Sequence, residues 1–172
     1  MGRGQPSQSD CLSDKERGGE TALEKTSILI VDDDESILAT LSAILKGEGY
    51  DIDTAKNGKE AIEKSKSRFF NLALLDIRLP DMEGTKLLTT MHDNMPKMVK
   101  IMLTGYPSLQ NAIEALNLGA DAYIIKPVNP EKLIKIIKEK LEKQREAKKI
   151  SEERVAKWIK KRVREIESEY PR

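Results

Sequence analysis

The sequence predicts an α/β fold in which five parallel strands form an open sheet with helices on both faces. Five short apolar runs recur at intervals of roughly 20 to 30 residues, about the length of one strand followed by one helix. Between these runs, apolar side chains recur with the three- and four-residue spacing of helices. The sequence therefore predicts a strand-helix unit that is repeated five times. The predicted strands are residues 28–31, 50–54, 72–75, 99–103 and 122–125.

Turn and cap residues separate the predicted units. Gly47 and Gly49 are placed to end the first helix, and Asn57 begins a turn before the second. Asn129 followed by Pro130 is typical of a helix start, with an N-cap and then a proline at the first helical position. These residues support the alternation of strands and helices.

The composition of the strands predicts how they are arranged. Residues 28–31 and 72–75 are almost entirely aliphatic, as expected of parallel strands that are covered on both faces. Right-handed crossovers then give a doubly wound sheet. Five units favour the strand order 2-1-3-4-5, although the sequence alone leaves other five-stranded orders open. In such a sheet, ligands bind beyond the carboxyl ends of strands 1 and 3.

Length and composition exclude several classes of protein. A chain of 172 residues has room for one ordinary domain with extensions. No apolar run approaches the roughly 20 residues of a membrane span, and residues 1–10 lack the apolar core of a secretory signal. Cys11 and His92 are single, which excludes an internal disulfide and a Cys/His zinc site. The sequence predicts a cytoplasmic protein, with His92 on its surface rather than in a phosphorelay.

Charge divides the chain into parts. Residues 1–25 are polar and rich in glycine, which predicts a disordered leader. Residues 26–142 hold the predicted strands and helices, and residues 143–172 form a basic amphipathic helical tail. Residues 26–128 carry 11 Lys/Arg and 15 Asp/Glu, whereas residues 129–172 carry 15 and nine. The acidic body and the basic tail are therefore expected to have different roles.

Polar residues follow four of the predicted strands. Asp32 and Asp33 come directly after the first strand, Asp76 follows the third, Thr104 the fourth and Lys126 the fifth. In a parallel sheet these side chains converge at one edge. Each residue alone has an ordinary explanation as a helix cap or a turn residue. Their occurrence together at successive strand ends favours a functional site.

The residue types at this edge suit a particular chemistry. Three carboxylates repel one another unless a cation lies among them, and oxygen ligands suit Mg²⁺. A carboxylate can also act as a nucleophile that accepts a phosphoryl group. Lys126 offers a positive charge and Thr104 a hydrogen-bond donor for phosphoryl oxygens. The cluster therefore indicates Mg²⁺-dependent phosphoryl transfer onto an aspartate.

Four motifs closely resemble the receiver domains of two-component response regulators, over roughly residues 26–142. The motifs are ILIVDDDESILATL (28–41), LALLDIRLPDMEG (72–84), IMLTGY (101–106) and DAYIIKPV (121–128). The resemblance implies the flavodoxin-like strand order, a cis bond between Lys126 and Pro127, and a sensor histidine kinase as the phosphodonor. Asp34 is surplus to the pattern and is interpreted as part of the loop.

The resemblance also implies a role for each site residue. Asp76 corresponds to the phosphoacceptor, Asp32 and Asp33 to the acidic metal-binding pair, and the backbone carbonyl of Arg78 to a further Mg²⁺ ligand. Thr104 and Lys126 correspond to the switch hydroxyl and the phosphate-pairing lysine, and Tyr123 to the switch aromatic residue. Arg78 and Tyr106 occupy positions that govern how easily water reaches the phosphoryl group.

The predicted function is that of a phosphorylation switch, which catalyses only its own phosphorylation and dephosphorylation. The alternative is a scaffold protein whose helical tail assembles a complex tuned by receiver phosphorylation. A flavin binder is disfavoured because the carboxylates after the first strand would repel a flavin phosphate. A dehalogenase-type phosphatase formally fits Asp32 and Asp34, but it leaves Asp76 unexplained.

The tail leaves more than one interpretation open. Val155, Trp158, Ile159, Val163 and Ile166 form an apolar stripe, and only Ala147 is apolar in residues 142–149. Either one helix runs from about residue 131 to 168, or two helices meet near Ile150 with Ser151 as an N-cap. The stripe is expected to pack on a protein target, on a second copy or on the receiver, and the helix 4–strand 5–helix 5 face is expected to contribute. Nucleic acid is a less favoured partner because the charges are nearly balanced.

Overall fold

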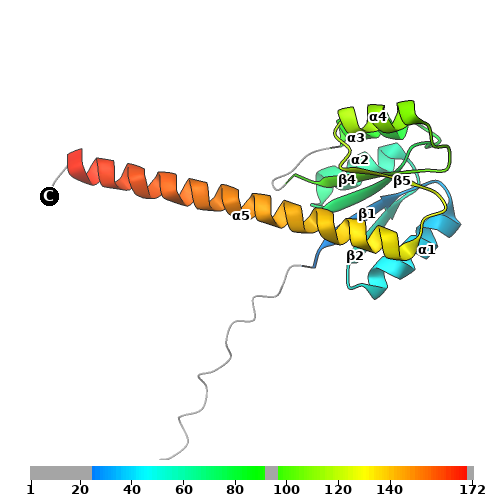
Figure 1. The fold of residues 1–172 in the computed structure, drawn as a ribbon, viewed down its shortest axis with the longest axis horizontal. Helices are drawn as coiled ribbons and strands as arrows, with labels where there is room; N and C mark the ends of the chain where they lie inside the picture. Colours follow the sequence, from blue (N-terminus) through cyan, green and yellow to red (C-terminus); the bar gives the residue numbers. More distant parts are fainter. Residues whose placement is uncertain (1–24, 92–96, 170–172) are drawn as a thin grey trace, which may run out of the picture.

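The computed structural model describes residues 25–91 and 97–169, in which strands and helices alternate (Figure 1). Residues 1–24, which are most of the predicted leader, and His92 lie outside the described residues. The strands are β1 (Ser27–Val31), β2 (Asp51–Ala55), β3 (Leu72–Asp76), β4 (Val99–Thr104) and β5 (Ala122–Ile125). The helices are α1 (Glu35–Gly47), α2 (Gly58–Ser67), α3 (Gly84–Thr90), α4 (Leu109–Asn117) and α5 (Pro130–Glu169).

The five strands form one parallel sheet with the order β2-β1-β3-β4-β5, which confirms the predicted order. β2 begins and ends one residue later than predicted. β3 and β4 each continue one residue further than predicted, so that Asp76 and Thr104 are the last residues of their strands. The register therefore places both side chains at the carboxyl edge of the sheet.

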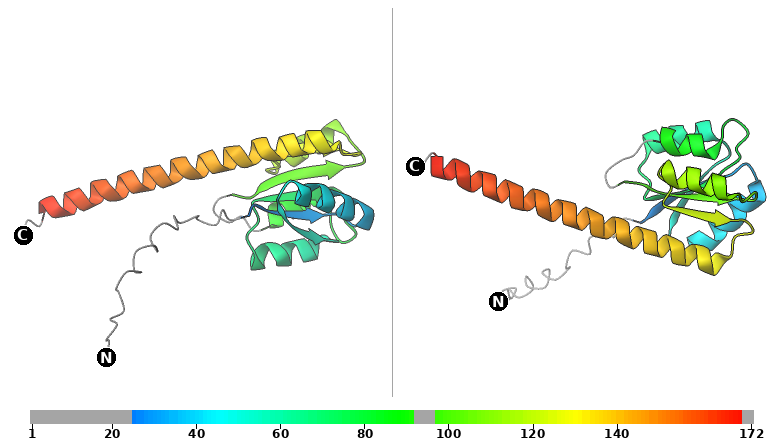
Figure 2. Two further views of the ribbon diagram at one scale, coloured as in Figure 1. Left: turned by 90° about the horizontal axis from the view of Figure 1, so that it is seen from below. Right: turned by 45° about the horizontal axis from the view of Figure 1, so that its top comes forward.

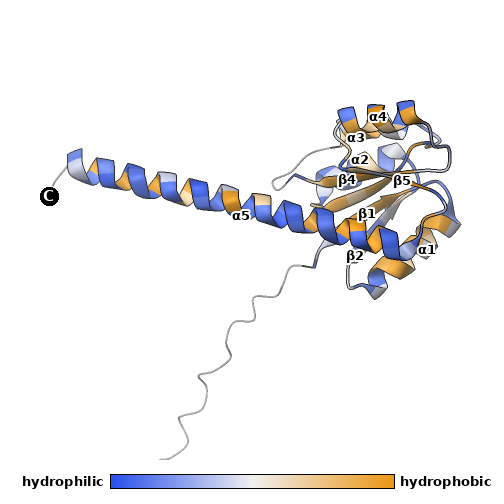
Figure 3. Cartoon of the chain, viewed as in Figure 1, coloured by the Kyte–Doolittle hydropathy of each residue, from blue (hydrophilic) through white to orange (hydrophobic). Residues whose placement is uncertain are grey.

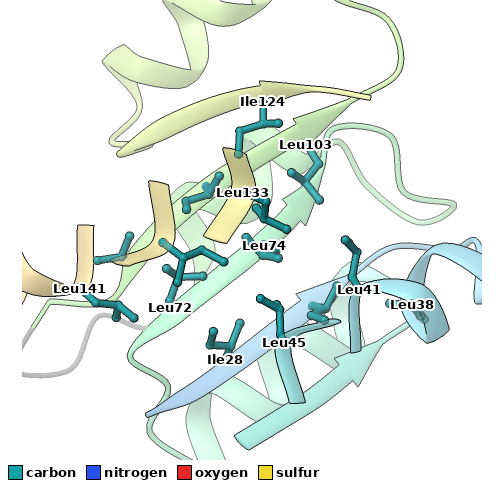
Figure 4. Packing of buried hydrophobic residues seen from close by; sticks show 14 residues of the cluster. Ile28, Leu38, Leu41, Leu45, Leu72, Leu74, Leu103, Ile124, Leu133 and Leu141 are labelled. Atoms are coloured by element: carbon teal, nitrogen blue, oxygen red, sulfur yellow. The ribbon is translucent and has the colours of Figure 1, made fainter. Parts of the chain in front are cut away.

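Alternation along the strands divides the core into two layers, because successive side chains point to opposite faces of a sheet. Ile28 and Ile30 face α1 and α5, whereas Leu29 and Val31 face α2, α3 and α4. Figure 4 shows the first layer, in which α1 and α5 contribute three buried residues each. These residues are Leu38, Leu41, Leu45, Leu133, Ile137 and Leu141.

The predicted caps are present at the helix ends. Gly49 has φ +89° just after α1, a backbone conformation that side chains with a Cβ rarely adopt. The side chain of Asn57 accepts a hydrogen bond from the backbone of Glu60 at the start of α2. Asn129 accepts one from the backbone of Lys132 at the start of α5. Local chemistry thus sets where these elements begin and end.

Helix α5 is a single helix of 40 residues, so the first of the two alternatives for the tail is correct. Ser151 lies inside the helix and caps nothing. Gln144 contacts the base of the sheet, donating from Nε2 to the carbonyls of Asn71 (2.9 Å) and Lys97 (2.7 Å), and Arg145 donates to Thr26 Oγ1 at 3.4 Å. Beyond Arg145 the helix extends away from the sheet, as both views in Figure 2 show. Among the described residues, no helix is long and apolar enough to cross a membrane.

Candidate functional site

Three carboxylates meet at the carboxyl edge of the sheet, as the sequence predicts. Asp32 follows β1 and Asp76 ends β3, and both are buried, whereas Asp33 is exposed. One carboxylate oxygen from each residue lies within 4.8 Å of the others. The strand order β1-β3 produces this contact, because it places the two strand ends side by side.

Lys126 joins two of these carboxylates. Its Nζ lies 2.6 Å from Asp32 Oδ2 and 3.1 Å from Asp76 Oδ1. Its backbone N–H donates to the carbonyl of Thr104 at 2.7 Å, which ties the end of β5 to the end of β4. The Lys126–Pro127 bond is cis, as the resemblance implied. Residues that are far apart in the sequence thus form one compact charged cluster.

Burial and charge change how these groups titrate. Burial raises the pKa of Asp76, the hydrogen bond from Lys126 opposes this rise, and the charges of Asp32 and Asp33 add to it. Burial disfavours the charged form of Lys126, but its bonds to Asp32 and Asp76 outweigh burial and raise the pKa of the ammonium. The lysine therefore stays charged beside the carboxylates at neutral pH.

The carboxylate cluster fits a divalent cation. It offers oxygen ligands, which Mg²⁺ prefers, and one of its members is exposed, so the cluster is open to solvent. Lys126 supplies one positive charge against three carboxylates, so a divalent ion would balance the remaining charge. The donor chemistry thus agrees with the Mg²⁺ site that the resemblance implies.

Asp34 has a structural role that the loop interpretation missed. Its side chain accepts hydrogen bonds from the backbones of Ser36 (2.8 Å) and Ile37 (3.3 Å), which caps α1. Its own N–H donates to Asp32 Oδ1 at 2.9 Å. The sequence carried this information, because an aspartate directly before a predicted helix is a common N-cap.

Two long side chains meet beside the carboxylates. The Arg78 guanidinium lies 4.0 Å from the centroid of the Tyr106 ring, within the range of a cation–π interaction. The backbone N–H of Tyr106 donates to Thr104 Oγ1 at 3.1 Å. Thr104 is buried, and this hydrogen bond connects it to the loop that carries Tyr106. The side chain of Tyr106 is 65% exposed.

The loop between β3 and α3 is fixed by a contact that the sequence did not reveal. Asp81 accepts hydrogen bonds from the backbones of Gly58 (2.8 Å) and Lys59 (2.9 Å) at the start of α2. Within the loop, the N–H of Gly84 donates to the carbonyl of Ile77 at 2.6 Å. These contacts hold the segment that includes Arg78.

Tyr123 lies on β5, where it packs partly buried against the core layer of α2, α3 and α4. Its hydroxyl is buried and, within the described part of the chain, accepts or donates no hydrogen bond. Lys100 is a second polar residue in this layer, and its Nζ donates to the carbonyl of Leu88 at 3.0 Å. Lys100 lies outside the motifs at the strand ends, although a lysine within an otherwise apolar strand is visible in the sequence.

Comparison with known proteins identifies the family. Residues 28–138 match the response regulator receiver domain. The chain belongs to this family. Its strand order is the one that the sequence motifs predict, and its five candidate site residues lie at the ends of four strands. The flavin-binding and phosphatase alternatives are not supported.

Several relatives are regulatory proteins. The chain is 41% identical over 110 residues to the transcriptional regulatory protein ZraR of Klebsiella oxytoca, which covers 64% of this chain and 25% of ZraR. It is 32% identical over 107 residues to the cell cycle response regulator CtrA of Brucella ovis, covering 62% of this chain and 46% of CtrA. The chain thus spans about a quarter of the length of the ZraR relatives that it matches.

Solved structures agree with this assignment. A CheY-like response regulator receiver domain protein from Methanospirillum hungatei JF-1 is 54% identical, with a TM-score of 0.69, and the match covers 72% of this chain and 98% of that one. The beryllofluoride-activated NtrC4 receiver domain dimer is 40% identical, with a TM-score of 0.65, covering 69% and 98%. The match covers almost all of each of the two solved chains, so the similarity is to receiver domains alone.

Proposed function

We propose that this receiver accepts a phosphoryl group on Asp76 from the phosphohistidine of a sensor histidine kinase. The observation that supports this most directly is the position of Lys126, whose ammonium lies 3.1 Å from Asp76 within a cluster of three carboxylates. A carboxylate oxygen of Asp76 attacks phosphorus while the phosphorus–nitrogen bond of the phosphohistidine breaks. The product is an aspartyl phosphate, and the imidazole of the kinase leaves.

Each neighbouring residue contributes to this transfer. Asp32, Asp33, Asp76 and the backbone carbonyl of Arg78 would hold Mg²⁺, which supplies positive charge against the repulsion between phosphoryl oxygens and carboxylates. Lys126 pairs with a phosphoryl oxygen, since its ammonium already lies beside Asp76. The Thr104 hydroxyl donates to another phosphoryl oxygen.

Phosphorylation then changes the surface of the domain. Drawing the Thr104 hydroxyl toward the phosphoryl group would weaken its bond with the N–H of Tyr106 and change the space beside Tyr123. Tyr123 lies on β5, which belongs to the surface formed by α4, β5 and α5. Leu109, Ile113 and Ile125 on that surface are exposed, so it offers apolar side chains to a downstream protein.

Labelling with acetyl phosphate and Mg²⁺ tests the acceptor. We expect Asp76→Asn to abolish labelling, because an amide cannot form the acyl phosphate. Asp34→Asn is the matched control: asparagine caps a helix as well as aspartate does, so this variant should be labelled almost like the parent. Chelation of Mg²⁺ should also prevent labelling of the parent. Labelling of Asp76→Asn at the parent level would place the acceptor elsewhere.

A further inference from the structure

The part of α5 that extends beyond the sheet carries an apolar stripe that no other part of the described chain covers. Val155 is 54% exposed, Trp158 66% and Ile159 49%. Figure 3 shows apolar residues recurring along this otherwise hydrophilic part of the helix. An isolated helix is marginal in water, and most helices are stabilised by packing of one face. The stripe therefore points to a partner.

Helical geometry gives the direction of the stripe. Ile137 and Val155 are about five full turns apart, and so are Leu141 and Ile159. Ile137 and Leu141 are buried against the sheet. In the straight helix of Figures 1 and 2, Val155 and Ile159 therefore face the same side as the receiver body. The stripe therefore continues the packed face of α5 past the base of the sheet. We call the corner between the stripe and the base of the sheet the notch.

The shape of this notch limits what can occupy it. A flat surface, such as a membrane, would meet the receiver body before it reached the stripe. A second helix is thin enough to lie along the stripe, with its end against the base of the sheet. The segment that would accept it, residues 145–169, begins where Arg145 contacts Thr26 at the base of the sheet and is about 37 Å long.

We propose that the notch is occupied by the same segment of a second copy, so that residues 145–169 of two chains pack antiparallel. Each receiver body then lies beyond the end of the partner's helix, and the two bodies do not compete for space. The contact is two-fold symmetric and closes on itself.

Charged residues within the stripe determine the orientation. When the two segments overlap over their full length, the centre of the pairing lies at the level of Lys157. Glu152 then faces the second copy's Arg162, and Val155 faces its Ile159. At each end of the pair, Arg145 of one copy faces Glu169 of the other copy. A parallel pairing in register would instead place Glu152 opposite Glu152 and Arg162 opposite Arg162, which like charges disfavour.

Four basic residues of the segment lie away from the contact and do not oppose this arrangement. Lys157, Lys160, Lys161 and Arg164 line one shared surface of the helix. By helical periodicity, this surface is opposite the stripe and faces away from the second copy. Repulsion between the two basic surfaces therefore acts over the width of both helices and is screened by salt.

Sedimentation of the unphosphorylated full chain tests the proposal. We expect a concentration-dependent dimer that Arg162→Glu or Glu152→Arg weakens by at least about tenfold, because each puts like charges opposite each other. The double variant should recover affinity to within about threefold of the parent, since it exchanges the members of each pair. Lys161→Glu and Glu153→Arg are matched controls, with the same charge changes next to these positions but on the outer surface, and should dimerise like the parent.

Cross-linking tests the orientation, in a Cys11→Ser background. Glu152→Cys and Arg162→Cys chains should form a mixed disulfide when combined. Neither should cross-link with itself, because identical positions are about 15 Å apart along the antiparallel pair. Self-cross-linking of each variant alone would show a parallel pairing and overturn the proposal.

Other outcomes would also overturn it. A parent that stays monomeric at millimolar concentration has no such contact. A dimer that all four single variants retain uses another surface. A monomer that binds anionic vesicles or DNA through the segment has a different partner. Circular dichroism should show equal helix content in all variants, so that loss of the dimer cannot be attributed to loss of the helix.

Discussion

Gly84 lies so close to the backbone of Asp76 that a side chain there has no room. A Cβ at this position would lie 2.2 Å from the carbonyl oxygen of Asp76. Gly84→Ala should therefore force a backbone shift and destabilise the domain by about 1–3 kcal/mol. Urea unfolding would measure this, with Gly47→Ala as the control. Gly47 has no atom within 4 Å of its ideal Cβ, so alanine there should be neutral or slightly stabilising. Equal stability of the two variants would contradict the steric argument.

Arg78 and Tyr106 are expected to set the lifetime of the aspartyl phosphate. The Arg78 guanidinium lies 4.0 Å from the centroid of the Tyr106 ring, and the two residues follow Asp76 and Thr104 by two positions each. We expect this pair to hinder an attacking water. Arg78 can also pair with a phosphoryl oxygen and hold its charge. We predict that Arg78→Asn combined with Tyr106→Ala speeds loss of the phosphoryl group without preventing phosphorylation.

The decay of purified phosphoprotein, followed by mass or by radiolabel, would test this prediction. Tyr106→Phe is a useful control, because it keeps the ring that Arg78 contacts and should decay at nearly the parent rate. If the double variant also decays at the parent rate, water access does not limit hydrolysis.

Whether the position of a site residue could be predicted from the sequence depends on the kind of contact that holds it. Asp32, Asp76 and Lys126 sit at strand ends, so the order of the strands was enough to bring them together. Asp81 contacts Gly58, which is 23 residues away on another element, and no local pattern indicates that pairing. Contacts of this kind depend on how loops fold over helix ends, which the sequence does not show.

At the scale of elements, α4 and β5 are expected to respond to phosphorylation. The Thr104 hydroxyl is held by the N–H of Tyr106 in the loop before α4, and the carbonyl of Thr104 accepts from the N–H of Lys126 after β5. A phosphoryl group that recruits the Thr104 hydroxyl therefore acts on both elements. The buried hydroxyl of Tyr123 has no hydrogen-bond partner among the residues that the structure describes, which favours a change, since burying a hydroxyl without a partner costs about 1–3 kcal/mol.

Amide exchange with and without beryllofluoride would test this response. We expect altered protection in α4 and β5 and unchanged protection in β2, which lies at the far edge of the sheet. Thr104→Val should keep the fold but suppress the change, because valine has no hydroxyl to recruit. Unaltered protection in α4 and β5 of the parent would count against this route.

The sequence predicted the start of helix α5 but not that it is one continuous helix. The caps and apolar spacing indicated its start at Pro130, and both alternatives for the tail kept its apolar stripe. Its continuity was left open because residues 142–149 carry only Ala147 as an apolar side chain. In the structure this stretch stays helical with polar contacts, such as that of Gln144 with the base of the sheet. A helix can pass through a polar stretch whose own residues are strong helix formers, and this stretch consists of Glu, Lys, Gln, Arg and Ala.

At the scale of the whole molecule, the chain divides into a receiver body and a helix that leaves it. The family match ends at residue 138, but Leu141 is still buried in the core and Gln144 still contacts the sheet. The body therefore extends slightly beyond the family boundary. The predicted boundary between residues 142 and 143 lies between these two contacts.

This division predicts that equivalent positions on α5 contribute very differently to stability. Leu141 is 3% exposed and Ile159, about five turns later on the same side, is 49% exposed. Leu141→Ala leaves a cavity in the core and should lower the free energy of unfolding by about 2–5 kcal/mol. Ile159→Ala shortens a half-exposed side chain on the part of α5 beyond the sheet, so its effect should stay within about 0.5 kcal/mol. Urea unfolding at low protein concentration, where a dimer would dissociate, separates this effect from any contact between chains. A comparable loss of stability in both variants would mean that the tail packs on the receiver within one chain.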